Sequence, residues 1–163
     1  MLKTLGIVEA CFQSPLERSR ASRKLGGKSV LEWIVRRATD CVRLGGVIVV
    51  TTDDPENQFL SKLVPSDVPL FTARKRDALG CLAAAVEQYP AHEAVRIGTS
   101  YPFIDPLLID RLIVAAAQDE FDYVGYCSRD GRPAILSPVG LYAEWFRAEA
   151  IRGGDAGKAR APD

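Results

Sequence analysis

The chain has 163 residues, of which 47% are apolar and 26% charged, an ordinary composition for one globular domain. Its 21 lysines and arginines balance its 21 acids, so no overall field would attract nucleic acid or an anionic membrane surface. No apolar run approaches the roughly 20 residues of a membrane span, and the start, MLKTLGIVEACF, lacks a convincing signal-peptide cleavage site. We therefore expect a cytoplasmic protein without nucleic-acid or membrane partners.

The cysteines give no pattern of a metal site. Cys11, Cys41, Cys81 and Cys127 are far apart in the sequence, form no CxxC pair and are accompanied by a single histidine, His92. This arrangement predicts neither a zinc site nor a disulfide framework, so we expect buried, reduced thiols. His92 has no cysteine near it in the sequence and is expected at the surface.

An alternation of strands and helices begins near the amino end. Residues 4–10 (TLGIVEA) form a short apolar run typical of a buried strand, and residues 47–51 (VIVVT) form a clearer one. Between them, a long loop precedes a predicted helix over residues 30–44, which begins at the Ser-x-x-Glu capping box of Ser29 and Glu32. This order predicts a βαβ unit with parallel strands and a right-handed crossover.

The alternation then continues with other lengths. A helix is expected from the acidic segment 53–56 (DDPE), and another from Asp105 and Pro106, which fit an N-cap and a first helical residue. The remaining expected elements are strands at 68–71, 94–98, 122–126 and 134–137, and helices at 77–89 and 141–151. The pattern predicts an α/β fold, a three-layer sandwich around a mostly parallel sheet. Residues 1–152 are predicted to form one domain, and residues 153–163 a flexible tail.

The loop over residues 11–28 is the first candidate for a ligand site. Ligands bind beyond the carboxyl ends of the strands in open parallel sheets, and this loop is too long for a minimal connection. Five cations and a Gly-Gly pair lie in it: Arg18, Arg20, Arg23, Lys24, Lys28 and Gly26-Gly27. Arginine side chains together with a close backbone approach suit a di- or triphosphate, whereas a solvated basic loop is an equally simple interpretation. Neither a Walker A motif nor GxGxxG is present.

A second loop holds acids that could serve a metal. Asp53 and Asp54 follow the strand at 47–51, where carboxylates could bind a cation. Acids are equally suited to a helix N-terminus, where the macrodipole stabilises them by about 0.3–1 kcal/mol. We favour the capping role and keep Asp53 and Asp54 as weak metal candidates only.

Four blocks of the chain resemble, in order, blocks of the cytidylyltransferases of sugar activation. They are KLGGKSVLEWIVRRA (24–38), VIVVTTDDPEN (47–57), VPLFTARKRDALG (68–80) and VRIGTSYPFIDPLLIDRLI (95–113). The nearest branch is the spore coat polysaccharide biosynthesis protein F family, related to CMP-KDO and acylneuraminate cytidylyltransferases. The resemblance implies a nucleotide-diphospho-sugar transferase fold of GT-A or Rossmann-like type. It also implies a reaction in which a sugar hydroxyl attacks the α-phosphate of CTP, with Mg²⁺ as cofactor.

The resemblance also assigns roles to individual residues. It implies nucleotide binding by Ser14, Arg23, Gly26, Gly27 and Ser100, and it places catalytic cations at Arg20 and Lys28. By this resemblance we expect the chain to lack the carboxyl-terminal segment that the family adds, and so to be a fragment or a truncated paralogue.

Several positions depart from the family pattern. Cys11 and Leu16 stand where the family has arginines, and Gln13 stands where it has a glycine. Thr72-Ala73 replaces an Arg-Gly pair. Ser100 replaces the aspartate that, by resemblance, binds Mg²⁺, and a neutral hydroxyl is a poor substitute for a carboxylate towards a hard divalent cation. The segment RPAILSP, near the position of further family acids, carries none.

Three functional hypotheses follow from these residues. We favour a degenerate cytidylyltransferase-like domain of nucleotide-sugar or surface polysaccharide biosynthesis that retains weak binding of CTP or another nucleotide. The second is an active sugar nucleotidyltransferase whose metal is bound differently, for instance by Asp53 or Asp54. The third is a non-catalytic interaction domain. A sugar substrate and a homodimer are the other partners that we consider.

Overall fold

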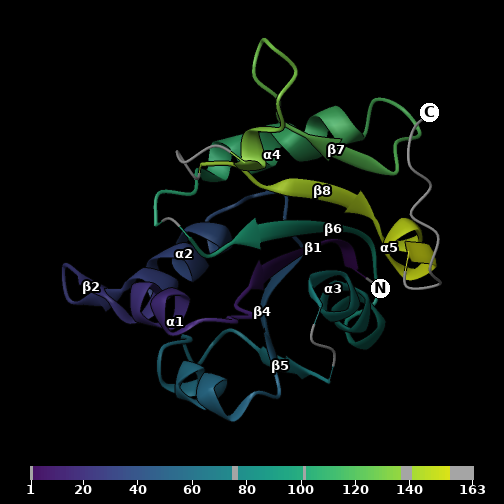
Figure 1. The fold of residues 1–163 in the computed structure, drawn as a ribbon. Helices are drawn as coiled ribbons and strands as arrows, with labels where there is room; N and C mark the ends of the chain where they lie inside the picture. Colours follow the sequence, from purple (N-terminus) through teal and green to yellow (C-terminus); the bar gives the residue numbers. More distant parts are fainter. Residues whose placement is uncertain (1, 75–76, 101, 137–140, 155–163) are drawn as a thin grey trace.

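The computed structural model describes residues 2–74, 77–100, 102–136 and 141–154. A six-stranded sheet with the order β5-β4-β1-β6-β8-β7 forms the centre, and helices cover both of its faces (Figure 1). Four strands are parallel: β1 (Leu2–Glu9), β4 (Gly46–Thr52), β5 (Leu70–Ala73) and β6 (Ala91–Gly98). Two short antiparallel strands complete the sheet: β8 (Glu144–Arg147) and β7 (Tyr123–Gly125). This mostly parallel α/β sandwich confirms the predicted fold class.

The helices divide between the two faces of the sheet. The α-helices are α1 (Pro15–Ser22), α2 (Val30–Thr39), α3 (Ala78–Gln88), α4 (Pro106–Ala116) and α5 (Ala148–Gly154). Two 3₁₀ segments, η1 (Pro55–Lys62) and η2 (Ala134–Leu136), and a small hairpin of β2 (Lys24–Leu25) and β3 (Lys28–Ser29) complete the described chain. Buried residues of α2 and α4 pack on one face, and those of α3 and α5 pack on the other. None of the helices within the described ranges is long and apolar enough to cross a bilayer.

Alternating burial along β1 explains how one strand serves both cores. Ile7 packs towards α3, whereas its neighbour Val8 packs towards α2, and both are fully buried. Successive side chains of a strand point to opposite faces, so a central strand with helices on both faces is apolar throughout. This is why the run TLGIVEA could be predicted as a buried strand.

The predicted helix starts are confirmed at three positions. Asp77 accepts the backbone N–H of Gly80 at 2.7 Å, and Asp105 accepts that of Leu107 at 2.9 Å. Ser29 accepts the N–H of Glu32 at 3.0 Å, but the Glu32 carboxylate turns to Lys28 instead of returning to the cap. The capping box predicted at Ser29 is therefore only half formed.

The predicted loop over residues 11–28 contains a helix and a hairpin. The helix, α1, begins at a complete capping box: Glu17 donates its N–H to Ser14 at 3.3 Å, and the Ser14 N–H donates to the Glu17 carboxylate at 2.9 Å. Because α1 is short and mostly polar, with only Ala21 buried, it gave no amphipathic signal in the sequence.

Several boundaries differ from the prediction. α2 ends at Thr39 rather than at residue 44, because the chain turns at Asp40. The segment over residues 55–62 is a 3₁₀ helix, and β5 begins two residues later than expected. These elements are short, and short periodic runs define an element better than they define its ends.

The prediction was wrong over much of the carboxyl-terminal part. The expected strand at 134–137 is the 3₁₀ segment η2 over its described residues, and residue 137 lies outside the described ranges. The expected helix at 141–151 begins as β8, whose Trp145 is buried against the sheet, and becomes helical only at Ala148. Pairing with β6 overrides the helical pattern here. The expected tail begins within α5, and residues 155–163 lie outside the described ranges.

Candidate functional site

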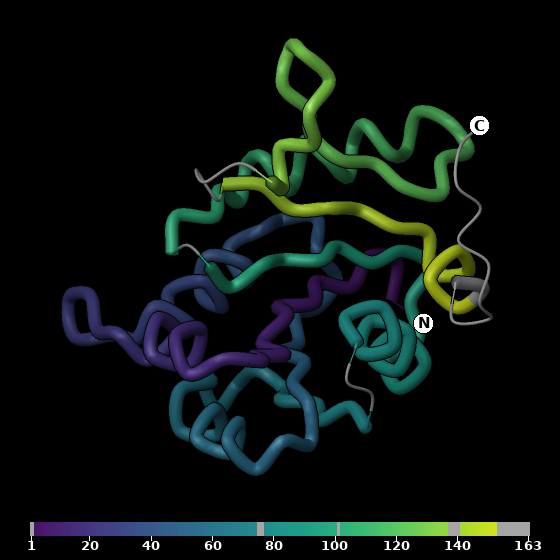
Figure 2. The backbone as a smooth tube through the Cα atoms, in the orientation of Figure 1, coloured from purple at the N-terminus to yellow at the C-terminus, as the bar shows by residue number. Residues whose placement is uncertain are grey.

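The carboxyl ends of the four parallel strands meet at one edge of the sheet. Figure 2 shows that the β2–β3 hairpin projects at this edge, opposite the start of β1. The segments that leave the strands here are those after Glu9, Thr52, Ala73 and Gly98. Ligands of open α/β sheets bind at this edge, so the site begins with these segments.

A hollow of about 460 Å³ lies at this edge, and we call it the basic hollow. Its lining residues are Arg20, Arg23, Lys24, Leu25, Val30, Ser100, Pro102 and Phe103. The structure thus brings together three residues that were singled out in the sequence, namely Arg20, Arg23 and Ser100. Lys24, which the sequence analysis named only as a cation of the 11–28 loop, also lines the hollow, and the structure adds an exposed aromatic side chain, Phe103.

The cations of the basic hollow are positioned by the end of α1 and by the hairpin. Arg20 lies in the last turn of α1, Arg23 caps it, and Lys24 begins β2. The Arg23 carbonyl accepts the N–H of Val30 at 2.9 Å, which ties the helix end to the start of α2. Within the described ranges, no carboxylate pairs with any of these three cations. Their charge is therefore available to an anion.

Gly26 and Gly27 have a structural role in the hairpin turn. Their φ angles are +59° and +87°, and a two-residue turn with both central residues in this region matches the right-handed twist of the strands. The hairpin is held from below by the Trp33 Nε1–H, which donates to the Leu25 carbonyl at 2.7 Å. Neither glycine lines the basic hollow, so their predicted nucleotide contact stays a prediction.

Ser14 and Lys28 are both engaged elsewhere. Ser14 forms the capping box of α1, and Lys28 pairs with the Glu32 carboxylate at 3.0 Å on the outer side of the hairpin. Neither lines the basic hollow. The geometry therefore does not bring these two candidates to Arg20, Arg23 and Ser100.

Arg18 is committed to a structural network. Its Nε donates to Asn57 at 3.0 Å, and its two terminal nitrogens pair with Asp54 at 3.1 Å and Glu56 at 2.6 Å. Only 12% of the Arg18 side chain is exposed, and Asn57 is fully buried. This cation of the 11–28 loop therefore holds α1 against η1 and is not free to bind phosphate.

The acids after β4 have different environments. Asp54 caps η1 by accepting the Glu56 N–H at 2.9 Å and also binds Arg18, which agrees with the favoured capping role. Asp53 is exposed and lines a separate hollow of about 390 Å³ together with Asp54 and Thr72. Neither acid lines the basic hollow.

The donor atoms of the basic hollow do not suit a hard divalent cation. Ser100 is exposed and offers one neutral hydroxyl, and among the described residues no carboxylate lines the same hollow. No group of three or more histidine, cysteine, aspartate or glutamate side chains capable of holding a metal occurs among residues 2–74, 77–100, 102–136 and 141–154. Mg²⁺ prefers carboxylate and phosphate oxygens, so these residues do not form a protein-based magnesium site.

A network of charged side chains across the sheet was not predicted from the sequence. Arg96 of β6 lies between Glu9 of β1 and Glu144 of β8; it bonds to both, with 2.7 Å between Arg96 Nη1 and Glu144 Oε2. Tyr123 of β7 donates its hydroxyl to Glu144 at 2.9 Å. Burial and this acceptor raise the pKa of Tyr123 to about 12. The available signal was that Glu9 and Arg96 lie inside apolar strand runs, which marks these two positions but not their pairing, whereas Glu144 lay in a segment predicted to be helical.

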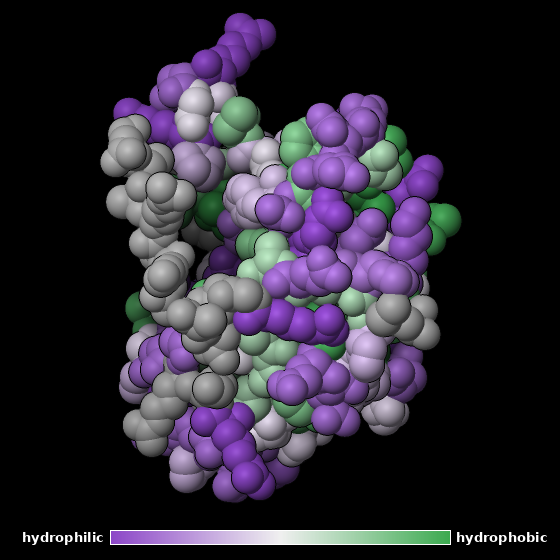
Figure 3. Space-filling model, turned by 90° about the vertical axis from the view of Figure 1, so that its right-hand side faces the viewer, coloured by the Kyte–Doolittle hydropathy of each residue, from purple (hydrophilic) through white to green (hydrophobic). Residues whose placement is uncertain are grey.

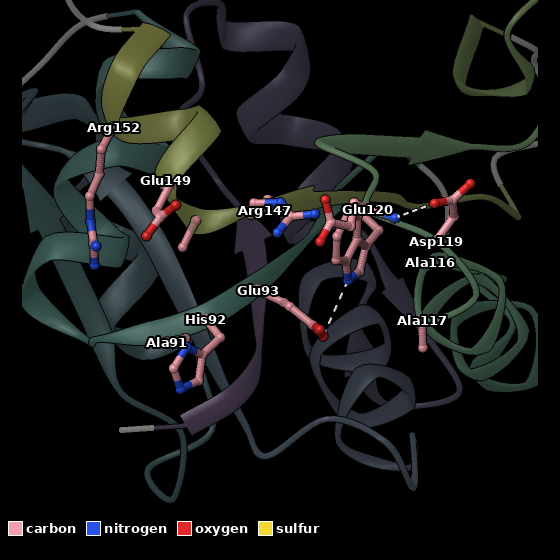
Figure 4. Close-up of a pocket in the computed structure, with 12 residues that line it drawn as sticks. Ala91, His92, Glu93, Ala116, Ala117, Asp119, Glu120, Arg147, Glu149 and Arg152 are labelled. Carbon is pink, nitrogen blue, oxygen red and sulfur yellow. Dashed lines mark hydrogen bonds between the residues drawn. The ribbon is translucent and has the colours of Figure 1, made fainter.

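A second hollow, of about 510 Å³, lies at the opposite edge of the sheet (Figure 4). Its Glu93 points towards Trp145, whose Nε1–H donates to it at 3.4 Å, and the buried Thr4 hydroxyl donates to the same oxygen at 2.7 Å. Arg147 pairs with Asp122 at 3.1 Å. Figure 3 views this side of the molecule and shows a mostly hydrophilic surface with smaller apolar areas between. Because Glu93 and Arg147 of this hollow are engaged in the fold and it lies away from the carboxyl ends of the parallel strands, we assign the ligand site to the basic hollow.

The histidine and two of the four cysteines lie where the sequence predicted them. His92 is exposed, as predicted. Cys41 and Cys81 are buried, but Cys11 is partly exposed and Cys127 is exposed, so the expectation of four buried thiols was wrong for two of them. Cys127 directly follows the strand expected at residues 122–126 and forms an isolated bridge with Pro133.

Comparisons with known proteins give the family of the chain and agree with its fold. A family model described as a MobA-like NTP transferase domain matches residues 14–161. A cytidylyltransferase from Leptospira borgpetersenii superposes with a TM-score of 0.75 at 16% identity, over 94% of this chain and 63% of that one. A CMP-2-keto-3-deoxy-manno-octonic acid synthetase complexed with CTP superposes with a TM-score of 0.69 at 13% identity, over 97% and 80%.

One curated relative matches along the sequence. It is an uncharacterised protein of Methanocaldococcus jannaschii, 29% identical over 151 residues, which are 92% of this chain and 59% of the relative. The chain thus spans less than two thirds of the length of this relative and of the Leptospira structure.

Proposed function

The chain belongs to the MobA-like NTP transferase domain family, and we propose that its basic hollow binds the phosphates of a nucleoside triphosphate. CTP is the first candidate, because the superposed structures are of cytidylyltransferases and one is complexed with CTP. Binding by this hollow is what the geometry supports best.

The observation that carries the proposal is a set of three cations in one hollow that have no carboxylate partner in the described part of the chain. Arg20, Arg23 and Lys24 converge there at the carboxyl edge of the sheet, where a triphosphate with several negative oxygens needs neutralisation. The volume of about 460 Å³ falls in the usual range for small-molecule sites. Phe103 adds an exposed aromatic surface suited to packing against a base.

We further propose that this binding does not depend on magnesium and that turnover is weak or absent. Ser100 supports this view, because it puts a hydroxyl into the hollow where the resemblance implies an aspartate. Transfer of a nucleotidyl group needs the developing phosphate charge to be neutralised, and cations alone neutralise it less completely than cations and a metal. In this interpretation the domain is a nucleotide-binding relative of an enzyme of nucleotide-sugar or surface polysaccharide synthesis.

One feature favours the alternative of an active enzyme. Asp53 is an exposed carboxylate after β4 and is not held by an ion pair within the described ranges. The nucleotide phosphates could bring a metal ion into the site, and Asp53 rather than Ser100 could then complete the coordination of that ion. Pyrophosphate release from CTP and a sugar acid, abolished in Asp53→Asn, would establish this alternative.

Calorimetric titration of CTP into the native protein tests the proposed site. We expect Arg20→Glu to weaken binding about tenfold or more, because a charge-assisted hydrogen bond contributes about 1.5–3 kcal/mol. Arg129→Glu is the matched control: it makes the same charge change at an exposed arginine outside the hollow and should leave affinity unchanged. Equal losses in both variants would mean that only net charge matters, and no binding in the native protein would favour an interaction domain instead. Parallel titrations with ATP, GTP and UTP identify the base preference.

A further inference from the structure

The basic hollow has an apolar wall in addition to its cations. Leu25, Val30, Pro102 and Phe103 form this wall. Val30 is buried, whereas Leu25 is 47% and Phe103 62% exposed. A single exposed apolar residue is ordinary at a protein surface, but two that line one hollow beside three cations make the hollow amphipathic. Such a hollow suits a ligand that is anionic at one end and flat and apolar at the other.

One helix fixes the two exposed side chains of this wall relative to each other. The Trp33 Nε1–H donates to the Leu25 carbonyl at 2.7 Å, and the Arg37 Nε–H donates to the carbonyl of the buried Ile104, directly after Phe103. Trp33 and Arg37 both belong to α2 and lie about one turn apart on the same side of it. The hairpin and the segment after β6 are thus held to the same helix. The wall is therefore formed before a ligand arrives, which lowers the entropic cost of binding.

The side chains of the hollow favour recognition of a base by its face over recognition by its edge. Among the described residues that line the hollow, only Ser100 has an uncharged side chain that forms hydrogen bonds. A site that pairs with the edge of its ligand rejects analogues that lack the matching groups, because its own polar groups are then left unpaired. Packing on an aromatic ring discriminates far less, because every base has a π-face.

We propose that Phe103 and Leu25 bind the nucleobase by packing against its faces, so that the hollow accepts purine as well as pyrimidine nucleoside triphosphates. Purines should bind at least as tightly as CTP, because their two fused rings offer a larger surface to the wall. This inference rests on the proposed phosphate site and adds the class of ligand, namely nucleoside triphosphates without selection for one base. CTP is one member of that class, and Phe103 and Leu25 are the residues that set it.

Calorimetric titrations of the full chain with CTP, UTP, ATP, GTP and inorganic tripolyphosphate, all with a chelator present, test the proposal. Tripolyphosphate carries the charge of the nucleotides but has no base. We expect the four nucleotides to bind within about tenfold of one another, with ATP and GTP at least as tight as CTP. Tripolyphosphate should bind more weakly than any of them, because it makes no contact with the apolar wall.

Substitutions in the wall should separate the base from the phosphates. Phe103→Ala should weaken all four nucleotides about fivefold or more and change the affinity for tripolyphosphate by less than about twofold. Leu25→Ala should act in the same direction to a smaller extent, and Phe103→Trp should restore nucleotide binding because it retains an aromatic face. Phe121→Ala is the matched control, since it removes an exposed phenylalanine outside the hollow and should leave all five affinities unchanged. Thermal unfolding verifies that each variant is folded.

The outcomes distinguish a failure of this inference from a failure of the phosphate site. If neither tripolyphosphate nor any nucleotide bound to the native protein, the phosphate site and this inference would both be overturned. If all five ligands bound but CTP was more than about tenfold tighter than UTP and ATP, the phosphate site would stand and the lack of base selection would be refuted. Nucleotide affinities unaltered in Phe103→Ala, or losses as large for tripolyphosphate as for CTP, would likewise overturn only the role of the wall.

Discussion

At the scale of single residues, equal charges have different roles because their partners differ. Arg18 and Arg20 are two positions apart on α1, yet Arg18 is nearly buried among Asp54, Glu56 and Asn57, and Arg20 faces the basic hollow. A count of arginines in the loop could not separate them, because their partners are distant in the sequence. The separation rests on tertiary contacts alone.

Removal of Arg18 should destabilise the fold. In Arg18→Ala, the buried Asn57 and the carboxylate of Asp54 lose a charged donor, and we expect a loss of about 1–3 kcal/mol in the free energy of unfolding. Arg20→Ala on the same helix is the matched control and should change stability by less than about 0.5 kcal/mol. Urea denaturation of both variants measures the difference; equal stabilities would show that the network contributes nothing.

The Tyr123 hydroxyl should make stability depend on alkaline pH. Burial and the Glu144 acceptor raise its pKa in the folded protein from the ordinary 10.0 to about 12, so folding favours the protonated form. Its stabilising contribution is complete below about pH 10 and is lost as pH rises towards about 12. We expect the native protein to be more stable than Tyr123→Phe at neutral pH, with a gap that narrows above about pH 10. A gap independent of pH would contradict the assignment.

At the scale of elements, the β2–β3 hairpin places Lys24 and Leu25 at the hollow. Both glycines of its turn have positive φ. The GG pair in the sequence is compatible with such a turn but does not by itself predict one. The same pair also occurs in phosphate-binding loops, so the sequence left both interpretations open. The hairpin was not predicted, because strands of two residues have no periodicity to detect.

Substitutions in the turn separate the backbone role from a ligand role. Gly27→Val should lower stability by about 1–2 kcal/mol, because a β-branched residue is strained at a φ of +87°. Gly26→Asn should be tolerated, since Asn-Gly is a preferred sequence for this turn. Thermal unfolding compares them. If Gly26→Asn were as damaging as Gly27→Val, backbone conformation would not explain both glycines.

At the scale of the whole molecule, the sequence predicted the mostly parallel sheet and the capped helices, and it pointed to the edge at which the basic hollow lies. These features follow from local patterns of burial and capping, such as those at Asp77 and Asp105. The sequence did not predict β8 or the ion-pair network of Glu9, Arg96 and Glu144, because strand pairing and ion pairing join residues from separate elements. Of the site residues, Arg20, Arg23 and Ser100 come together, whereas Ser14 and Lys28 do not.

The homodimer stays a prediction. Light scattering of the purified chain measures its mass in solution directly, and the same sample serves the binding experiments. The interface would then be sought on surfaces outside the basic hollow.

We propose above all that the chain keeps a cationic nucleotide site without the acid that would hold a metal. The most direct test is calorimetric titration of CTP into the native protein and into Ser100→Asp, each with Mg²⁺ and with a chelator. We predict that the native protein binds CTP equally under both conditions, and that Ser100→Asp binds more tightly only when Mg²⁺ is present. Binding by the native protein that requires Mg²⁺ would contradict the account.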